Sequence, residues 1–401
     1  MLNDIITAQL EDHDSFYIYD EQHIRSQAQL LRTHFPDVDF FYSLKCNPNP
    51  HILRTIFSEG FGADAASLKE VQLAADAGLR QSQIYYSAPG KSPADLEGAF
   101  NAATIIADSI GELDHLERLA AREGTVAEIG VRVNPAFSMN GGDGLSAKFG
   151  IDEEMLLPIL KNRHMPHLMV TGIHVHLQSQ VLDSDKLQAY YQNVLSLADR
   201  VEAALGRPLM YINMGSGIGL AYAAHQTPLD IPALGLAAGK YLARYRNAHP
   251  YTRIFIESGR FCVGQSGQYV TTVRDRKVSR GKTWLILSNT LNGFIRPSID
   301  QMMRSYPDAQ PFEPLFTCRD AFHIRTLKKD PPSEQVNLVG NLCAGTDLIA
   351  EDILLPKLAV GDAIIIDNAG AYAAVLSPTQ FSSLTPPAEL FVTTAGNVLS
   401  D

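Results

Sequence analysis

The segment DFFYSL (39–44) is a short apolar run, and seven similar runs follow it along the chain. They are FGAD (61–64), IYYS (84–87), TIIAD (104–108), IGVRVN (129–134), VTGIHVH (170–176), MYINM (210–214) and IFIES (254–258). Helix-like segments separate them; SLKEVQLAADAG (67–78), for example, begins with a serine that can cap a helix and ends in glycine. Eight strands alternating with helices predict a parallel (β/α)8 TIM barrel over residues 25–264. We favour this barrel over the alternative, an open doubly wound sheet.

Beyond Gly264 the pattern changes to strand-like runs divided by Pro, Gly, Asn and Asp. These runs are QYVTTVRDRKV (268–278), TWLILS (283–288), EQVNLVG (334–340), DAIIIDN (362–368) and AELFVTT (388–394). They predict a C-terminal antiparallel β domain over residues 265–401. The strand-like opening DSFYIYD (14–20) assigns residues 1–24 to the same domain, and the stretch 299–316 is predicted to be a surface excursion.

The composition narrows the class of protein. Of the 401 residues 45% are hydrophobic, and the formal net charge of −11 argues against a nucleic-acid binder or a polybasic membrane binder. No apolar run approaches the roughly 18 residues of a membrane helix, and acids stand where a signal peptide would carry Lys or Arg. Four scattered cysteines without a C-x-x-C pair predict a reduced, cytoplasmic protein with no zinc site.

Distinctive polar residues recur at the ends of the predicted barrel strands, where barrel enzymes keep their chemistry. They are Lys45, Asp64, His174, His176, the turn MGSGIG (214–219) and Glu257, with Arg260 just beyond. Within the turn, the backbone N–H groups of Gly215, Ser216 and Gly217 are open to an anion, and we expect a helix to follow. Arg260 adds positive charge, so the turn predicts a phosphate site; a plain tight turn is the alternative.

Lys45 at the end of an apolar strand is unusual, because burial of an ammonium group is costly. It is either a surface lysine or an amine that forms a Schiff base. A reactive lysine, a phosphate cradle and a carboxylate facing a pyridinium nitrogen are what pyridoxal phosphate requires, and Glu257 supplies the carboxylate. His176 could stack on the cofactor ring or be an ordinary core histidine. We expect only one of His174 and His176 to line the interior, so no metal is expected.

These motifs resemble the fold-type III pyridoxal-phosphate decarboxylases, which include diaminopimelate, ornithine and biosynthetic arginine decarboxylases. The resemblance covers nearly the whole chain and is carried by the order of its motifs. They are FYSLKCNPNPHIL (41–53), GFGADAASLKEV (60–71), SAKFGI (146–151), GIHVHLQSQ (172–180), NMGSGIG (213–219), ESGR (257–260), NLCAGTD (341–347) and AGAY (369–372). The family implies an alanine-racemase-like barrel with a C-terminal β domain.

The resemblance also implies roles for individual residues. Lys45 is the implied Schiff-base lysine, Glu257 the pyridinium partner and His176 the stacking residue. The implied phosphate-site positions are Ser179, Gly217, Arg260 and Tyr372. Cys343, expected to protonate Cα, and Asp347 match a loop that enters the neighbouring subunit, so a homodimer with shared active sites is implied.

Departures from the family pattern fall on the expected substrate pocket. Ala344 stands where the family has an acid for the substrate's distal amine, and Asp300 replaces the Tyr of the motif that begins at Arg296. Gln178, Ser216 and Ser258 replace a Gly, a Gly and a Pro. Arg296 remains to pair with a carboxylate, and Asp300 could replace the missing acid. The departures resemble the siderophore branch that decarboxylates citryl-diaminopropionate-type intermediates.

We therefore expect a pyridoxal-phosphate-dependent α-decarboxylase, a carboxy-lyase, acting on an amino acid with a polar or anionic distal group. A citryl-diaminopropionate-like siderophore intermediate is the first candidate. The alternatives are a diaminopimelate decarboxylase of lysine biosynthesis, an amino-acid racemase and a non-catalytic regulator that keeps the fold. The racemase needs a second base, commonly Tyr, and the Cys343 loop speaks against it.

Overall fold

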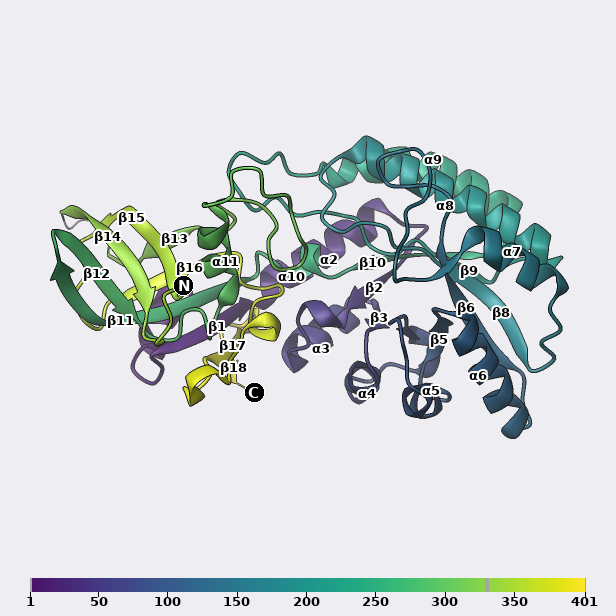
Figure 1. Cartoon of the computed structure of the whole chain (residues 1–401), viewed down its shortest axis with the longest axis horizontal. Helices are drawn as coiled ribbons and strands as arrows, with labels where there is room; N and C mark the ends of the chain where they lie inside the picture. Colours follow the sequence, from purple (N-terminus) through teal and green to yellow (C-terminus); the bar gives the residue numbers. More distant parts are fainter. Residues whose placement is uncertain (1, 329–331, 401) are drawn as a thin grey trace. The chain divides into compact units, whose positions relative to one another are not determined.

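The computed structural model of the protein describes residues 2–328 and 332–400. It divides into two compact units, and each is described by itself (Figure 1). The barrel unit comprises Gln27–Leu220 and Pro228–Gly259, and the β unit comprises Met1–Ser26, Ala221–Thr227 and Arg260–Asp401. The short segment 221–227 thus leaves the barrel unit and returns to it, a detour that no sequence pattern indicates.

Eight parallel strands close into a barrel, which confirms the predicted fold class. They are β2 (Asp39–Ser43), β3 (Gly62–Ala65), β4 (Ile84–Tyr86), β5 (Thr104–Ala107), β6 (Ala127–Asn134), β8 (Leu168–His174), β9 (Tyr211–Asn213) and β10 (Arg253–Ser258). Their order is β5-β4-β3-β2-β10-β9-β8-β6, and pairing of β5 with β6 closes the ring. Each strand coincides with one of the eight apolar runs.

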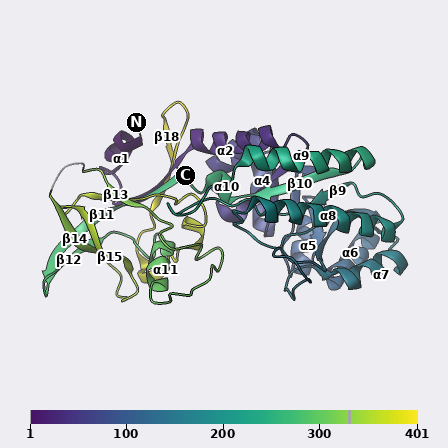
Figure 2. The same ribbon diagram turned by 90° about the horizontal axis from the view of Figure 1, so that it is seen from above.

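Helices follow the strands and cover the outside of the barrel (Figures 1 and 2). They are α2 (Glu21–His34), α3 (Pro50–Ser58), α4 (Leu68–Asp76), α5 (Pro93–Ala99), α6 (Ile110–Arg122), α7 (Glu153–Asn162), α8 (Ser184–Leu205) and α9 (Ile231–Ala248); β7 (Ile151–Asp152) adds to the edge of β6. The predicted cap is present, since Ser67 Oγ accepts a hydrogen bond of 3.1 Å from Glu70 N. Within the described residues, no helix is both long and apolar enough to cross a bilayer.

The barrel interior holds one apolar layer, a cluster of Phe41, Tyr85, Ile106, Tyr211 and Phe255. The remaining strands contribute glycines at this level, because the large side chains already fill the space. A Cβ on Gly62 would lie 2.3 Å from the Phe41 ring, and one on Gly172 would lie 2.3 Å from the Tyr211 ring. Aromatic and glycine positions therefore interlock around the ring of strands, as packing in a barrel core requires.

The β unit contains a second sheet with the order β15-β14-β12-β11-β1-β17-β18, while β16 pairs with β11 and β13. The strands are β1 (Ser15–Asp20), β11 (Gly267–Ser279), β12 (Lys282–Leu287), β13 (Ile324–Thr326), β14 (Ser333–Gly340), β15 (Leu348–Pro356), β16 (Ala363–Ile366), β17 (Ala388–Val392) and β18 (Val398–Ser400). A core that includes Phe16, Ile18, Val270 and Ile365 lies against helix α1 (Leu2–Gln9).

Most strand pairs of this unit are antiparallel, as predicted, but β1–β17 and β12–β14 are parallel. Parallel neighbours need a long connection, and both pairs have one. The whole barrel separates β1 from β17, whereas helix α11 (Ile295–Met303) lies between β12 and β14.

The predicted surface excursion at 299–316 is wrong at both ends. Helix α11 buries residues from Arg296 to Asp300, and Phe316 is also buried. Only the middle, residues 304–308 and 310–312, is exposed. The expectation failed because tertiary contacts bury this segment: Arg296, for example, donates to Leu315 O, Thr317 Oγ1 and Ala371 O, and no local pattern encodes such contacts.

Candidate active site

A polar layer lies one inward-facing position beyond the apolar layer of the barrel. Side chains two residues apart on a strand point to the same side, so each apolar-layer residue is followed by a second inward residue. These residues are Ser43, Asp64, Ser87, Asp108, Arg132, His174, Asn213 and Glu257, and all are buried. They lie at the carboxyl ends of the strands, the end at which barrel enzymes carry their active sites.

Glu257 is a buried, ionised carboxylate at the end of β10. Asn213 Nδ2 donates to its Oε1 over 2.8 Å, and His174 Nε2 lies 3.2 Å from the same oxygen. Burial favours the neutral acid, but the pKa of Glu257 is held below its ordinary value by His174 and by the charge of Lys45. A carboxylate kept ionised in this way can hold a proton on a heterocyclic nitrogen.

His176 follows β8 and is held from both sides of its ring. The Ser216 N–H donates to Nδ1 over 3.2 Å, and Ser179 Oγ lies 3.3 Å from Nε2. Burial lowers the pKa of His176 to about 3, so the ring is neutral near pH 7. A neutral, half-buried imidazole suits stacking on an aromatic ligand.

The expectation that only one of the two histidines faces the interior is wrong. His174 contacts Glu257, and the charges of both His174 and Glu257 act on His176. The physical reason is the strand period of two, which sends residues i and i+2 to the same side.

Lys45 lies in the short 3-10 helix η1 (Leu44–Cys46) directly after β2. Its Nζ is 3.2 Å from Asp64 Oδ2, and 46% of its side chain is exposed while Asp64 is fully buried. Ser43 and Ser87 each donate to Asp64, over 2.8 and 2.6 Å. These hydrogen bonds hold the Asp64 carboxyl group in place next to an accessible amine.

The turn 214–219 requires glycine at its start. Gly215 has φ of +62°, and a Cβ there would lie 2.3 Å from Val175 O. The amides of Gly215 and Ser216 already donate to Asn213 Oδ1 and His176 Nδ1, whereas the amide of Gly217 makes no hydrogen bond among the described residues. The expected helix does not follow directly, because the chain detours through 221–227 and α9 begins only at Ile231, after the Asp230 cap.

In the β unit, two buried arginines meet at one hydroxyl group. Arg260 Nη1 donates to Thr317 Oγ1 over 3.0 Å and Arg296 Nη2 over 2.8 Å, while Arg260 Nη2 forms an ion pair with Glu313. The guanidinium of Arg260 also lies 4.9 Å from the centre of the Tyr372 ring. We call Arg260, Arg296, Thr317 and Glu313 the guanidinium cluster.

Arg296 makes more hydrogen bonds within its own chain than we expect of a residue that binds substrate. Its Nη1 donates to Ala371 O over 3.1 Å and its Nε to Leu315 O over 3.3 Å, and only 1% of the residue is exposed. One turn later, Asp300 is buried with its Oδ1 unpaired in the described structure. Burial raises the pKa of Asp300 to about 6.

Cys343 is exposed on the loop that joins β14 to β15. Asp347 organises this loop from within: its Oδ1 accepts from Thr290 Oγ1 and from Leu291 N, and its Oδ2 accepts from Leu342 N. Ala344 O accepts from the amide of Asp347. Both carboxylate oxygens of Asp347 are thus engaged, and substrate would have to displace a donor to reach them.

Several members of the polar layer carry no assigned role in the sequence interpretation. Asp64 ends a predicted strand, yet its function as the anchor of Lys45 is visible only in the structure. Asn213, Arg132 and Asp108 also stand at strand ends, and counting two residues on from each buried apolar or glycine position of the barrel layer would have found them.

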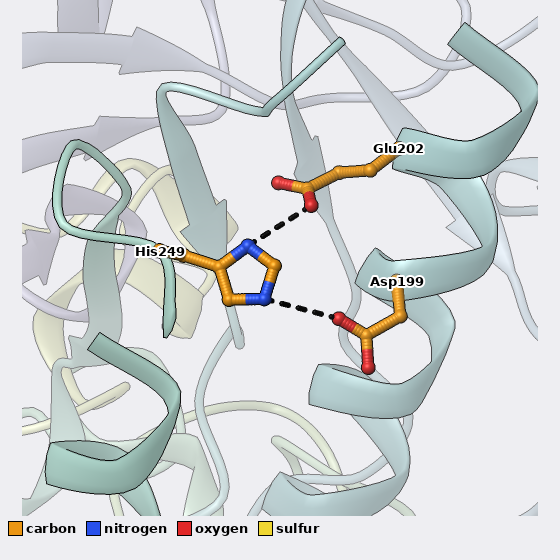
Figure 3. Close-up of side chains that lie close together, drawn as sticks. All are labelled: Asp199, Glu202 and His249. Atoms are coloured by element: carbon orange, nitrogen blue, oxygen red, sulfur yellow. Dashed lines mark ion pairs between the residues drawn. The ribbon is translucent and has the colours of Figure 1, made fainter. Parts of the chain in front are cut away.

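Among the described residues, one group of possible metal ligands joins α8 to the residue that follows α9 (Figure 3). His249, after α9, has Nδ1 3.0 Å from Glu202 and Nε2 3.4 Å from Asp199, both on α8. These residues precede the first residues of β9 and β10, so they are remote from the strand ends that carry Lys45 and Glu257. Because a carboxylate already contacts each ring nitrogen, the group acts as an ion-pair link between two helices.

Comparison with known proteins adds the family context. The family model described as "Pyridoxal-dependent decarboxylase, pyridoxal binding domain" matches residues 21–264, more than half of the chain. An L-glutamyl-[BtrI acyl-carrier protein] decarboxylase from Niallia circulans is 31% identical over 384 residues, covering 94% of this chain and 88% of the relative. Diaminopimelate decarboxylase from Helicobacter pylori is 29% identical, covering 92% and 87%. The crystal structure of a Helicobacter pylori diaminopimelate decarboxylase with L-lysine gives a TM-score of 0.82 at 26% identity, covering 98% and 95%.

Proposed function

Because the chain belongs to the pyridoxal-dependent decarboxylase family, with pyridoxal phosphate as its cofactor, we propose that it decarboxylates an amino acid whose distal end is polar or anionic and carries no ammonium group. The observation that carries this proposal is Ala344, a methyl side chain where an acid for the distal amine is expected. A citryl-diaminopropionate-like siderophore intermediate remains the first candidate substrate. A glutamyl group carried by an acyl-carrier protein is another candidate, by analogy with the carrier-protein decarboxylase.

The residues of the barrel rim suit the cofactor. Lys45 offers an accessible amine, Glu257 a buried anion and His176 a neutral ring to lie against the pyridine. The amide of Gly217 has no hydrogen-bond partner in the described structure. The hydroxyl group of Ser179 lies close by, 3.3 Å from Nε2 of His176. We assign the phosphate to Ser179 and to the turn Gly215–Ser216–Gly217, and the resemblance to the family adds Arg260 and Tyr372 as phosphate-site residues.

Bound pyridoxal phosphate would supply an electron sink for the electron pair of the bond between Cα and the departing carboxylate. The residues of the chain prepare and complete that reaction. Glu257 holds a proton on the pyridine nitrogen, Lys45 Nζ holds and releases the cofactor, and Asp64 orients that amine. Cys343 Sγ then delivers a proton to Cα, a general-acid step that typically contributes about 10²–10⁴-fold.

We further propose a homodimer in which Cys343 of one subunit serves the Lys45 site of its partner. The exposure of Cys343 on a loop braced by Asp347 supports this, because such a loop is rigid enough to present a side chain. We place the protein in the cytoplasm, since its cysteines form no disulfide within the described residues.

Diaminopimelate decarboxylation is the second candidate, favoured by the relatives that carry this name. It needs an acid for the distal ammonium, and Asp300 is then the replacement for Ala344. Arg296 would bind the distal carboxylate. An unpaired buried ammonium costs several kcal/mol, so without such an acid diaminopimelate and ornithine should be poorer by about two orders of magnitude or more in kcat/KM.

The test compares kcat/KM for CO₂ release from diaminopimelate and from citryl-diaminopropionate. It uses the wild type, Ala344→Glu and Asp300→Asn. We expect the wild type to prefer the citryl conjugate and Ala344→Glu to gain activity toward diaminopimelate. Efficient diaminopimelate turnover by the wild type that is lost in Asp300→Asn would contradict the proposal. It would identify Asp300 as the residue that binds the distal ammonium group.

A further inference from the structure

Arg132, near the end of β6, is a buried member of the polar layer whose donors are mostly unused. Only 6% of the residue is exposed. Within residues 2–328 and 332–400 its one hydrogen bond is a long one, from Nη1 to Ser87 O over 3.5 Å, and its guanidinium carbon lies 4.4 Å from the centre of the Phe149 ring. A guanidinium has five N–H donors, and buried donors are normally paired. The other four can therefore bind a ligand.

The positive charge of Arg132 is only weakly compensated. Asp108 Oδ1 lies 3.7 Å from Nη1, beyond hydrogen-bond range, and has no hydrogen-bond partner among the described residues. Burial raises the pKa of Asp108, which makes this acid a poorer counter-ion. Glu112, which accepts from Asp108 N, pairs with Lys91 instead, over 2.8 Å. Arg132 thus keeps charge to offer to an anion.

The surroundings of Arg132 connect it to the residues that we assign to the cofactor. The charges of Arg132 and Lys45 both act on the ring of His176. Ser87 links Arg132 to the partner of Lys45, because its carbonyl oxygen accepts from Arg132 and its hydroxyl group donates to Asp64 over 2.6 Å. All of these residues belong to the barrel unit, so their arrangement does not depend on where the β unit lies.

The cofactor has one polar group for which the proposed function names no residue. Lys45 takes the aldehyde carbon, Glu257 the pyridine nitrogen, and the turn 215–217 the phosphate. The remaining group is the hydroxyl on the ring carbon next to the one that bears the aldehyde. In its ionised form this oxygen is an anion, which a guanidinium binds well in a buried site.

We propose that Arg132 is a further cofactor-binding residue, whose guanidinium group holds the ring oxygen of pyridoxal phosphate in its ionised form. The inference rests on the proposed function for the cofactor and for Lys45 as its point of attachment, but not for the substrate. A positive charge at this place lowers the pKa for the proton that the ring oxygen shares with the Lys45 nitrogen. Arg132 thereby sets the pH at which the absorbance of the bound cofactor changes.

The first measurement is a pH titration of the absorbance of the holoenzyme without substrate. In Arg132→Met the midpoint should rise by about one pH unit or more, because loss of a cation favours the protonated form. Arg132→Gln removes the same charge with a polar side chain and should show the same rise, whereas Arg132→Lys keeps the charge and should recover most of it. Arg118→Met changes an exposed arginine on α6 and should leave the midpoint unchanged.

A second measurement separates a contact with the ring oxygen from an effect on folding. The holoenzymes are loaded with pyridoxal phosphate or with 3-deoxypyridoxal phosphate, which lacks the ring hydroxyl, and cofactor release into cofactor-free buffer is followed by absorbance. Arg132→Met should release pyridoxal phosphate at least about tenfold faster than the wild type and the deoxy cofactor at an unchanged rate.

Two results would overturn the inference. One is an unchanged midpoint in both Arg132→Met and Arg132→Gln, and the other is an equal acceleration of release for the two cofactors. Because neither measurement contains substrate, efficient decarboxylation of diaminopimelate would defeat the proposed function and leave the test of Arg132 intact.

Discussion

The polar layer of the barrel and the guanidinium cluster of the β unit are both buried and charged, but they are built differently. The barrel takes each polar side chain from the same position of a strand, two residues beyond an apolar or glycine residue. The cluster takes Arg260 from the short helix α10 (Arg260–Val263), Arg296 from α11, and Glu313 from an irregular segment. One site follows from a repeating period, and the other depends on where individual loops end.

This difference separates two kinds of control. Strands hold Glu257 and Asp64 in fixed places with their charges satisfied, so the barrel suits chemistry that must not vary. Glu313 lies next to an exposed stretch and keeps one oxygen unpaired among the described residues, so the polar groups of the cluster are less completely satisfied than those of the barrel. Changes of the polar barrel residues should therefore abolish the reaction, and in the β unit a change of Cys343 should abolish it as well.

The largest expected effect is that of Lys45→Ala, which should remove decarboxylation and leave the fold intact. The amine is needed to exchange the cofactor onto substrate, and its partner Asp64 is buried independently of it. Purified Lys45→Ala should be colourless or hold the cofactor only non-covalently, as borohydride trapping and mass spectrometry would report. Lys69→Ala, an exposed lysine on α4, is the matched control. Turnover by Lys45→Ala near the wild-type rate would remove Lys45 from the mechanism.

Mixed dimers test whether Lys45 of one subunit and Cys343 of the other act in the same active site. Lys45→Ala and Cys343→Ala should each be inactive alone. After random mixing, about half of the dimers are hybrids with one intact site each, so about a quarter of the wild-type activity should return. Native mass spectrometry would verify that hybrids form. Hybrids without activity would mean that Cys343 serves the Lys45 of its own chain.

The smallest effect concerns Asp300 and is a change in stability. Its pKa is raised to about 6 by burial, so between pH 3.8 and 6 the folded state binds more protons than the unfolded state. The wild type therefore loses stability as the pH rises through this window. Asp300→Asn avoids that loss and should be more stable by about 1–3 kcal/mol at pH 7.5, with no such gain at pH 4.

Denaturant unfolding at the two pH values would measure the Asp300 difference, with the exposed Asp308→Asn as control. The side chain of asparagine can still accept from Asp320 N, which donates to Asp300 over 3.1 Å. If Asp300→Asn were less stable at pH 7.5 than at pH 4, relative to the wild type, an ionised Asp300 would have to be a stabilising partner.

The barrel could be predicted from sequence because each strand repeats the same signal. All eight apolar runs became strands, and the N-terminal run 14–20 joined the second sheet as β1. Strand β15 was not foreseen: LIAEDILLP carries three charged or proline residues, and its pairing with β14 decides its structure. Parallel pairing of β12 with β14 was also hidden, because strand direction depends on the path of the connection.

Site residues at the ends of strands could be predicted from the sequence, whereas those in loops could not. Lys45, Glu257 and His176 could be placed from their positions after apolar runs, and the structure brings Glu257 and His176 into one electrostatic neighbourhood. Glu313 gave no signal, since an acid in a segment rich in proline and polar residues is typical of a solvated loop. Its contact with Arg260 spans 53 positions of the chain, a separation that no local pattern encodes.

The pairing of β1 also fixes an order of events during synthesis. β1 is made among the first 20 residues, but its two sheet partners are β11 (Gly267–Ser279) and β17 (Ala388–Val392). Both of its edges therefore stay open on the ribosome while the barrel strands emerge, and the second edge is covered only when the chain is almost complete. β10 closes the barrel by residue 258, so that unit can mature first. A nascent chain stalled after the barrel would carry Lys45, His176 and Glu257 together with an aromatic-rich strand, SFYIYD, whose edges are available to bind a chaperone or another chain.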